Sequence, residues 1–186
     1  MKLTILINDS EIATLDVDLD EKTGERCQMS TITSGVKTCV NSVDFSLYFN
    51  QKMKDKGIVA NKTKMQKLLY ICYGTYLKVF DMAQLFDEKP MAWDYGPAFS
   101  SVYSAQKSND DGLDGLLPLC QEKLKELMQF DTLIDSVLDF FGDWTSWELV
   151  EWTHEKGTAW DKKYSKERYA ALSNEDIFED FSRYVM

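Results

Sequence analysis

The chain has 186 residues, of which 44% are hydrophobic and 13% aromatic, and its formal net charge is −10. This composition excludes a globally disordered chain, and the length predicts a single domain with at most a small appendage. No run of about 18 apolar residues is present, which excludes a transmembrane helix, and the N-terminal MKLTILIND turns acidic too early for a signal peptide, so we expect a cytoplasmic protein.

In chain order, the first predicted element is a β-hairpin. Residues 3–7 and 13–19 alternate apolar with polar side chains, and Asn8-Asp9-Ser10 between them has the chemistry of a turn. Residues 31–40 are expected to form a loop or a third short strand. The hairpin therefore precedes the helical part of the chain as an N-terminal element.

Helices dominate the rest of the chain. They are expected over residues 43–56, 61–80, 98–107, 116–130, 133–141 and 147–155 and from residue 173 onward, with an irregular segment at residues 157–168. The helix at 61–80 is the central one, because Met65, Leu68, Cys72 and Tyr76 share one face and further apolar residues occupy its other sides. The predicted fold class is mainly α (α+β), a compact helical domain around this helix with an N-terminal β-hairpin appendage.

The charge is unevenly distributed along the chain. Residues 46–109 carry nine basic and five acidic side chains, whereas residues 110–186 carry eight basic and 18 acidic ones, a net charge of −10. An acidic C-terminal half argues against direct nucleic-acid binding, which requires a basic surface. The acidity is compatible with a role in solubility alone, or with a partner protein that has a basic surface.

Few residues are available for metal binding or catalysis. His154 is the only histidine, and none of the four cysteines, Cys27, Cys39, Cys72 and Cys120, forms a C-x-x-C pair. The spacing excludes a zinc site, and we expect free thiols in a reducing compartment. G-x-S-x-G and G-x-x-x-x-G-K motifs are missing as well, so we expect no catalytic residues, no metal and no cofactor.

Four separated motifs resemble the Panacea-domain family, also described as SocA-like or phage-associated proteins. They are N-K-T-K-M-Q-K-L-L-Y at residues 61–70, L-F-D-E-x-x-x-A-W-x-Y-G-P at 85–97, T-H-x-x-x-x-x-W at 153–160 and L-S-N-E-D-I at 172–177. The resemblance covers about residues 41–186. It implies a SocA-like helical domain over that range, with residues 1–40 as an added hairpin extension.

The same resemblance implies a function in protein binding. Members of the family occur in prophages and toxin–antitoxin loci, and they act as antitoxins or as adaptors that deliver a toxin to a protease. We therefore expect a non-catalytic module of phage or mobile-element origin whose partner is a toxin or a protease. An alternative is a phage anti-defence protein, for example an anti-CRISPR inhibitor, whose acidic surface blocks a nucleic-acid-binding defence effector.

One set of candidate partner-binding residues is polar and aromatic. Gln66 lies in the K-x-Q-K pattern of the family, where it either closes a hydrogen bond between helix and loop or contacts a partner. Trp93, Tyr95, Trp152 and Trp160 either pack between helices or form a groove of aromatic anchors for a partner.

A second set is titratable. His154 is the only side chain whose usual pKa lies near neutrality; we expect a hydrogen bond to the backbone or to the loop at residues 93–95, or a contact with a partner, rather than catalysis. Asp131, Asp135 and Asp139 are spaced at i, i+4 and i+8, so they predict one acidic helix face that steers a basic partner.

Overall fold

The computed structural model describes the chain over residues 2–7, 10–16, 39–108, 113, 119 and 121–184. Its helices are α1 (Ser42–Asp55), α2 (Lys62–Val79), α3 (Ser100–Lys107), α4 (Gln121–Met128), α5 (Asp131–Phe141), α6 (Ser146–Thr153), α7 (Ala159–Tyr164) and α8 (Asn174–Tyr184). Its strands are β1 (Lys2–Ile7), β2 (Ser10–Asp16), β3 (Met91–Trp93) and β4 (Gly96–Ala98). The expected mainly helical fold is confirmed. Among the described helices, none combines the length and apolarity needed to cross a membrane.

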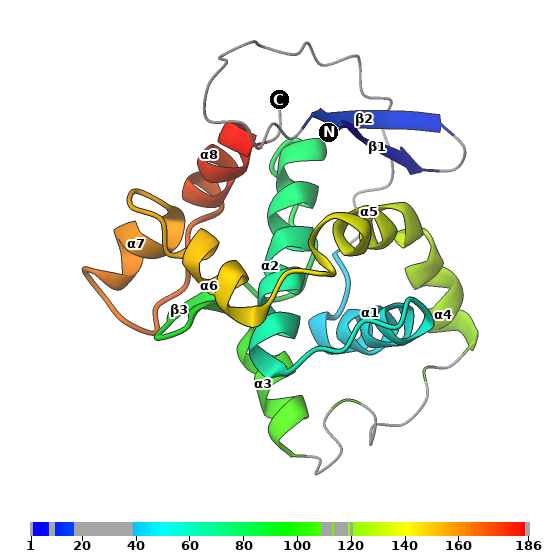
Figure 1. The fold of residues 1–186 in the computed structure, drawn as a ribbon, viewed down its shortest axis with the longest axis horizontal. Helices are drawn as coiled ribbons and strands as arrows, with labels where there is room; N and C mark the ends of the chain where they lie inside the picture. The colour runs from blue at the N-terminus through cyan, green and yellow to red at the C-terminus, as the bar shows by residue number, and fades with distance from the viewer. Residues whose placement is uncertain are drawn as a thin grey trace.

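Helix α2 runs through the middle of the molecule (Figure 1). Helices α1, α4 and α5 lie on one side of it, α6, α7 and α8 on the other, and α3 beside its first turns. Asn61 caps α2 by accepting a hydrogen bond from the backbone N–H of Lys64 at 2.9 Å. Fifteen of the 18 residues of α2 are buried. The prediction of a central helix from its apolar periodicity is therefore confirmed.

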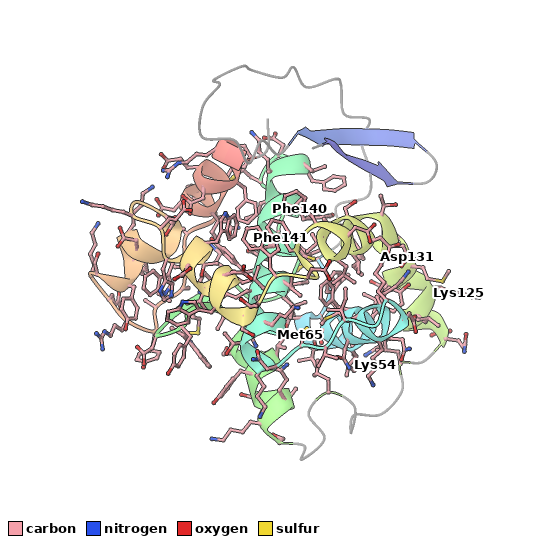
Figure 2. All side chains as sticks on the ribbon, in the orientation of Figure 1. Lys54, Met65, Lys125, Asp131, Phe140 and Phe141 are labelled. Carbon is pink, nitrogen blue, oxygen red and sulfur yellow. The ribbon has the colours of Figure 1, made fainter. Side chains whose placement is uncertain are left out.

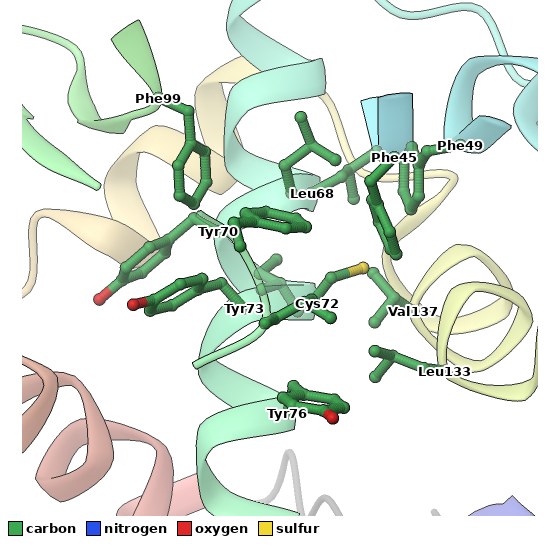
Figure 3. Packing of buried hydrophobic residues seen from close by; sticks show 14 of the residues in the cluster. Phe45, Phe49, Leu68, Tyr70, Cys72, Tyr73, Tyr76, Phe99, Leu133 and Val137 are labelled. Carbon is green, nitrogen blue, oxygen red and sulfur yellow. The ribbon is translucent and has the colours of Figure 1, made fainter. Parts of the chain in front are cut away.

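One side of α2 packs against α1 and α5 through large apolar side chains. Phe45 and Phe49 of α1 and Leu133 and Val137 of α5 point toward α2 in Figure 3. All four are buried, and the ring of Phe45 lies 5.7 Å from that of Phe130 at the turn before α5. These contacts join the consecutive helices α1 and α2 with α5, which is distant in sequence, into one core.

The opposite side of α2 is approached by α8 at Gly74. A Cβ atom at this position would overlap with the ring of Phe181, so only glycine leaves room for α8 at this distance. Phe181 is 3% exposed. The centroid of its ring lies 5.7 Å from that of Tyr70 and 5.8 Å from that of Trp152. Gly74 thus sets how closely the C-terminal helix can pack.

Three elements differ from the sequence prediction. The helix expected over 116–130 is shorter, since Leu119 is not helical and α4 runs from Gln121 to Met128. Strands β3 and β4 form a short antiparallel hairpin that was not predicted, with Ala92 opposite Pro97. The irregular segment expected at residues 157–168 is wrong in part, because α7 occupies Ala159–Tyr164. This helix begins where the hydroxyl of Thr158 accepts a hydrogen bond from the N–H of Asp161, an ordinary N-cap.

The predicted N-terminal hairpin is confirmed. Strands β1 and β2 pair antiparallel, with a register shift between Ile5 and Leu6, and β1 lies near α5. Residues 17–38, which include most of the predicted loop or third strand at 31–40, lie outside the described residues. Val40 is buried and exchanges two backbone hydrogen bonds with the segment at Leu85–Asp87. The helical body therefore includes Val40, one residue before the predicted boundary at 41.

The close packing at Gly74 leads to a first prediction. Alanine ordinarily stabilises a helix by about 1 kcal/mol relative to glycine. Here we expect Gly74→Ala to lower the free energy of unfolding by about 1–3 kcal/mol, because the added methyl group overlaps with Phe181. Urea denaturation of this variant, of Phe181→Leu and of the double variant measures the coupling between the two positions. The double variant should lose less stability than the sum of the two single losses, because a smaller side chain at 181 makes room for the added methyl group. A more stable Gly74→Ala protein would contradict the packing of α8 on this turn.

The second prediction concerns the boundary of the helical body. A chain shortened to residues 39–186 is expected to fold and unfold cooperatively. A chain shortened to residues 41–186 loses Val40 and its two backbone hydrogen bonds, and it should be less stable by about 1.5–3 kcal/mol, the usual value for burying such a side chain. Thermal denaturation of both chains measures the difference. Failure of the 39–186 chain to fold would mean that the N-terminal hairpin belongs to the core.

Candidate functional site

A pocket of about 290 Å³ opens beside the first turns of α2. It is formed by the start of α2, the β3–β4 hairpin, α3 and the segment that follows α7. The residues that give it its chemistry are Lys62, Gln66, Lys67, Trp93, Tyr103 and Tyr169. Among the described residues, this is the site where predicted candidates and exposed aromatic side chains come together.

The β3–β4 hairpin forms one wall of the pocket, and a glycine holds it against α2. Gly96 has a φ of +94°, which favours glycine. A Cβ atom there would lie 2.8 Å from Cε of Lys67 and 2.7 Å from the hydroxyl oxygen of Thr153. On its outer edge, β3 pairs with the segment after α7, since the N–H of Ala92 donates to the carbonyl of Ala170 at 2.9 Å. The hairpin is therefore held from both sides.

Lys67 lies at the bottom of the pocket. It is 1% exposed, and its ammonium group donates a hydrogen bond to the carbonyl oxygen of Pro97 at 2.8 Å. Within the described part of the chain, no carboxylate forms an ion pair with it. Burial without a counter-ion lowers the pKa of Lys67 from 10.5 to about 7. Lys67 belongs to the K-x-Q-K pattern, but its burial was not predicted, because lysine is rarely fully buried without a charged partner.

The side chain of Gln66 forms two hydrogen bonds with the backbone of the loop that follows β4. Its side-chain N–H donates to the carbonyl of Phe99 at 3.3 Å, and its side-chain oxygen accepts from the N–H of Phe99 at 2.7 Å. Gln66 is buried and also lines the pocket. Of the two interpretations, the hydrogen bond between helix and loop is the one that the geometry contains; a contact with a partner stays a prediction.

His154 lies at the end of α6, against Trp160. The two rings are parallel with centroids 3.6 Å apart, and Nε2 of His154 is buried with no hydrogen-bond partner among the described residues. Burial and the nearby Lys67 lower the pKa of His154 to about 4, so it is neutral at neutral pH. The expected hydrogen bond to the loop at 93–95 is made by Trp160 instead, whose indole N–H donates to the carbonyl of Trp93 at 2.8 Å.

The remaining aromatic candidates divide into two groups. Trp152 packs against Phe181 in the core and does not line the pocket. Trp93 is half-buried in the pocket wall and meets the ring of Tyr103 edge-on at 4.8 Å. Tyr95, Tyr103 and Tyr169 also line the pocket and are 69%, 37% and 51% exposed; we call these three residues the aromatic rim.

The rim is fixed in part by Asp94. Its two carboxylate oxygens accept hydrogen bonds from the hydroxyl groups of Tyr164 and Tyr169, each at 2.7 Å. These two hydrogen bonds hold the pKa of Asp94 below its usual value. The carboxylate that lines the pocket is therefore directed toward tyrosine hydroxyl groups, and Lys67 is left without a counter-ion.

The predicted acidic face of α5 lies away from the pocket and against α1. Asp131 accepts a hydrogen bond from the hydroxyl of Tyr48, and its position over α1 is visible in Figure 2. Lys52 of α1 and Lys56, which caps the end of α1, form ion pairs with the aspartates at 131, 135 and 139, at 2.7–3.9 Å. Two ammonium groups thus face three carboxylates. The two lysines reduce the net negative charge of this face. Its role in steering a partner stays a prediction.

The described residues contain no group of three or more histidine, cysteine, aspartate or glutamate side chains arranged to hold a metal ion. Cys39 and Cys72 are free thiols, the first exposed and the second buried. Burial raises the pKa of the Cys72 thiol, which leaves it protonated. The chemistry of the candidate site therefore comes from Lys67 and the aromatic rim.

Comparison with known proteins gives one family. Residues 65–161, just over half of the chain, match the family described as antitoxin SocA-like, Panacea domain. The matched segment runs from the first turns of α2 to the start of α7 and contains Lys67, Gly96 and Tyr103, whereas Lys62 and Tyr169 lie outside it. No curated protein and no solved structure matches the chain.

The buried Lys67 leads to a third prediction. Between pH 7 and 10.5 the unfolded chain holds the proton of Lys67 and the folded chain releases it, so raising the pH favours folding. Relative to Lys67→Met, the wild-type protein should therefore gain up to about 1.4 kcal/mol of stability per pH unit above pH 7. Urea denaturation at several pH values measures this difference.

The control for this prediction is Lys64→Met. Lys64 is also buried and donates to the carbonyl of Gly142 at 2.6 Å, but the nearby Asp143 and Glu148 partly offset the lowering of its pKa. Its replacement should change the pH dependence less. Parallel stability curves for wild type and Lys67→Met would show that Lys67 keeps its ordinary pKa.

Proposed function

The chain belongs to the SocA-like antitoxin, Panacea-domain family, and from this membership we propose that it neutralises a toxin by binding it, without catalysis. The observation that carries the proposal is the family match itself, which extends over most of the central helix, the β3–β4 hairpin and α3. Membership supports an antitoxin-type role. Origin in a phage or mobile element, neutralisation of a toxin, and delivery of the toxin to a protease are parts of our proposal.

The arrangement around His154 supports binding rather than catalysis. A nucleophilic mechanism requires a serine or cysteine within hydrogen-bond reach of the base. Nε2 of His154 has no such partner among the described residues, its ring is stacked on Trp160, and it is neutral at neutral pH. The side chains of this region therefore act as packing groups.

The aromatic rim is the surface we propose for the toxin. Tyrosine contributes strongly to protein–protein interfaces because its ring is large and its hydroxyl group can be hydrogen-bonded at the edge of the contact. Tyr95, Tyr103 and Tyr169 are exposed around one opening. The chain has a net charge of −10, so it would attract a toxin with a basic surface over long range, in addition to the contacts at the rim.

The anti-defence alternative depended on an open acidic surface. Asp131, Asp135 and Asp139 are instead paired with Lys52 and Lys56 within the chain. No further observation favours a nucleic-acid-binding effector as the target, so we propose the antitoxin role alone.

The fourth prediction is that a gene next to the one for this chain encodes a toxin. Co-expression of the two proteins should rescue growth from the toxin, and they should co-purify as a complex of defined stoichiometry. Tyr95→Ala should weaken the complex tenfold or more, the effect expected of an interface residue worth about 1.4 kcal/mol.

Trp147→Ala is the matched control for Tyr95→Ala. Trp147 is 63% exposed on α6 and is not part of the pocket; its indole N–H donates to Glu151 at 2.8 Å. Its removal should change the affinity less than threefold, a small effect on the usual scale of interface substitutions. Equal effects of the two substitutions would place the toxin elsewhere. Absence of both rescue and binding would contradict the antitoxin role.

A further inference from the structure

The pocket combines a buried cation with aromatic walls. The ammonium group of Lys67 has three N–H donors, and the carbonyl of Pro97 takes one of them. Lys62, also in the lining, adds an exposed positive charge. Lys67 itself also lines the pocket, whose walls include Trp93 and Tyr103. An occupant that satisfies both features must bring an anion and an apolar group.

No other lining group takes the place of that anion. The two oxygens of Asp94 accept hydrogen bonds from Tyr164 and Tyr169. Both ends of the Gln66 amide are bonded to Phe99. The charged form of Lys67 is therefore compensated only in part, by the carbonyl of Pro97, and an anion entering the pocket would supply an ion pair.

The size of the pocket limits the occupant. At about 290 Å³, it lies at the lower end of the range for small-molecule sites, which is about 300–1,000 Å³. It accommodates about one large amino-acid residue and is too small for a folded helix. An occupant of this size must carry its charge and its apolar group on the same residue.

We propose that the pocket binds the C-terminal residue of a partner protein, with the terminal carboxylate paired to Lys67 and an aromatic or aliphatic last side chain against Trp93 and Tyr103. The partner's identity as a toxin rests on the proposed function. A C-terminal residue carries both groups, whereas an internal aspartate or glutamate has a carboxylate but no apolar side chain of its own. Capture of a terminal carboxylate is a recurring mode of peptide recognition.

The fifth prediction tests the pocket with peptides and the full-length protein. The probes are acetyl-Gly-Gly-Phe with a free C-terminal carboxylate, the same peptide as its C-terminal amide, and acetyl-Gly-Asp-Phe-amide, which has only an internal carboxylate. Titrations followed by amide chemical shifts should show the free acid binding at least tenfold more tightly than the other two, with shifts at Lys67 and Gly96. Equal affinities of the free acid and the amide overturn the proposal. Tightest binding of the internal aspartate overturns the choice of a chain terminus.

Lys67→Met and Lys64→Met form a matched pair for the same titration. Both replace a buried lysine of α2 that donates to a backbone carbonyl, but only Lys67 lines the pocket. The preference for the free acid should disappear in Lys67→Met and persist in Lys64→Met. Persistence in both variants overturns the role of Lys67. The comparison of the three peptides on the wild-type protein decides the proposal even if Lys67→Met does not fold.

The toxin gives a separate readout. If the toxin binds but the free-acid peptide does not, the pocket proposal fails and the antitoxin role stands. If the peptide binds with the expected preference and no toxin is recognised, the antitoxin role fails and the pocket stands. If both bind, extending the toxin by a C-terminal Gly-Ser should weaken the complex about tenfold; unchanged affinity overturns the proposal that the toxin's C-terminus occupies the pocket.

Discussion

The burial of α2 on all sides is the constraint from which the rest of the structure follows. A helix enclosed in this way cannot direct its polar residues to water, so three of them near its start bind backbone groups of other segments. Lys64 donates to the carbonyl of Gly142, Gln66 exchanges two hydrogen bonds with Phe99, and Lys67 donates to Pro97. The first two turns of α2 thereby hold two segments in place, the turn at Gly142 and the segment at residues 97–99. The second of these segments forms part of the pocket wall.

Those contacts also explain why Lys67 is tolerated in the interior. A buried ammonium group without a hydrogen bond would be strongly destabilising. One backbone carbonyl compensates in part, and the lowered pKa allows the group to lose its charge when nothing else enters. The site can therefore persist empty in a neutral form and become charged when an anion arrives. This behaviour depends on Gly96, since a side chain there would occupy the space of the lysine.

Much of the helical body could be predicted from the sequence, because long amphipathic segments and their caps leave a periodic signal. The 61–80 helix is an example of the periodic signal, and Thr145 and Glu148 have the T-x-x-E spacing of the capping box that the structure contains. Strands β3 and β4 have three residues each, too few for an alternating pattern. Helix α7 was missed although Thr158 and Asp161 have the spacing of an N-cap pair, because six residues carry little periodicity.

The candidate site was only partly predictable. Motif similarity identified Gln66, Trp93 and Tyr95, but Tyr103 and Tyr169 meet them only through the fold. The spacing of the α5 aspartates correctly placed them on one face, and the matching spacing of Lys52 and Lys56 was the sign that this face is covered by α1. Lys67 lies in the motif at residues 61–70, but its burial could not be predicted from the sequence, since it depends on the position of the β3–β4 hairpin.

The way the hairpin is held has a consequence for how the protein can diversify. Lys67 and Gln66 form hydrogen bonds with backbone groups of residues 97 and 99. These backbone groups are present whichever side chains the two residues carry, except for the N–H that proline lacks. Apart from Gly96, the scaffold therefore places little demand on the identity of the side chains around the opening. Substitutions at Tyr95 or Tyr103 can change the shape and polarity of the rim while the framework beneath it is preserved. Descendants of one ancestral chain could in this way exchange one binding partner for another without first having to refold.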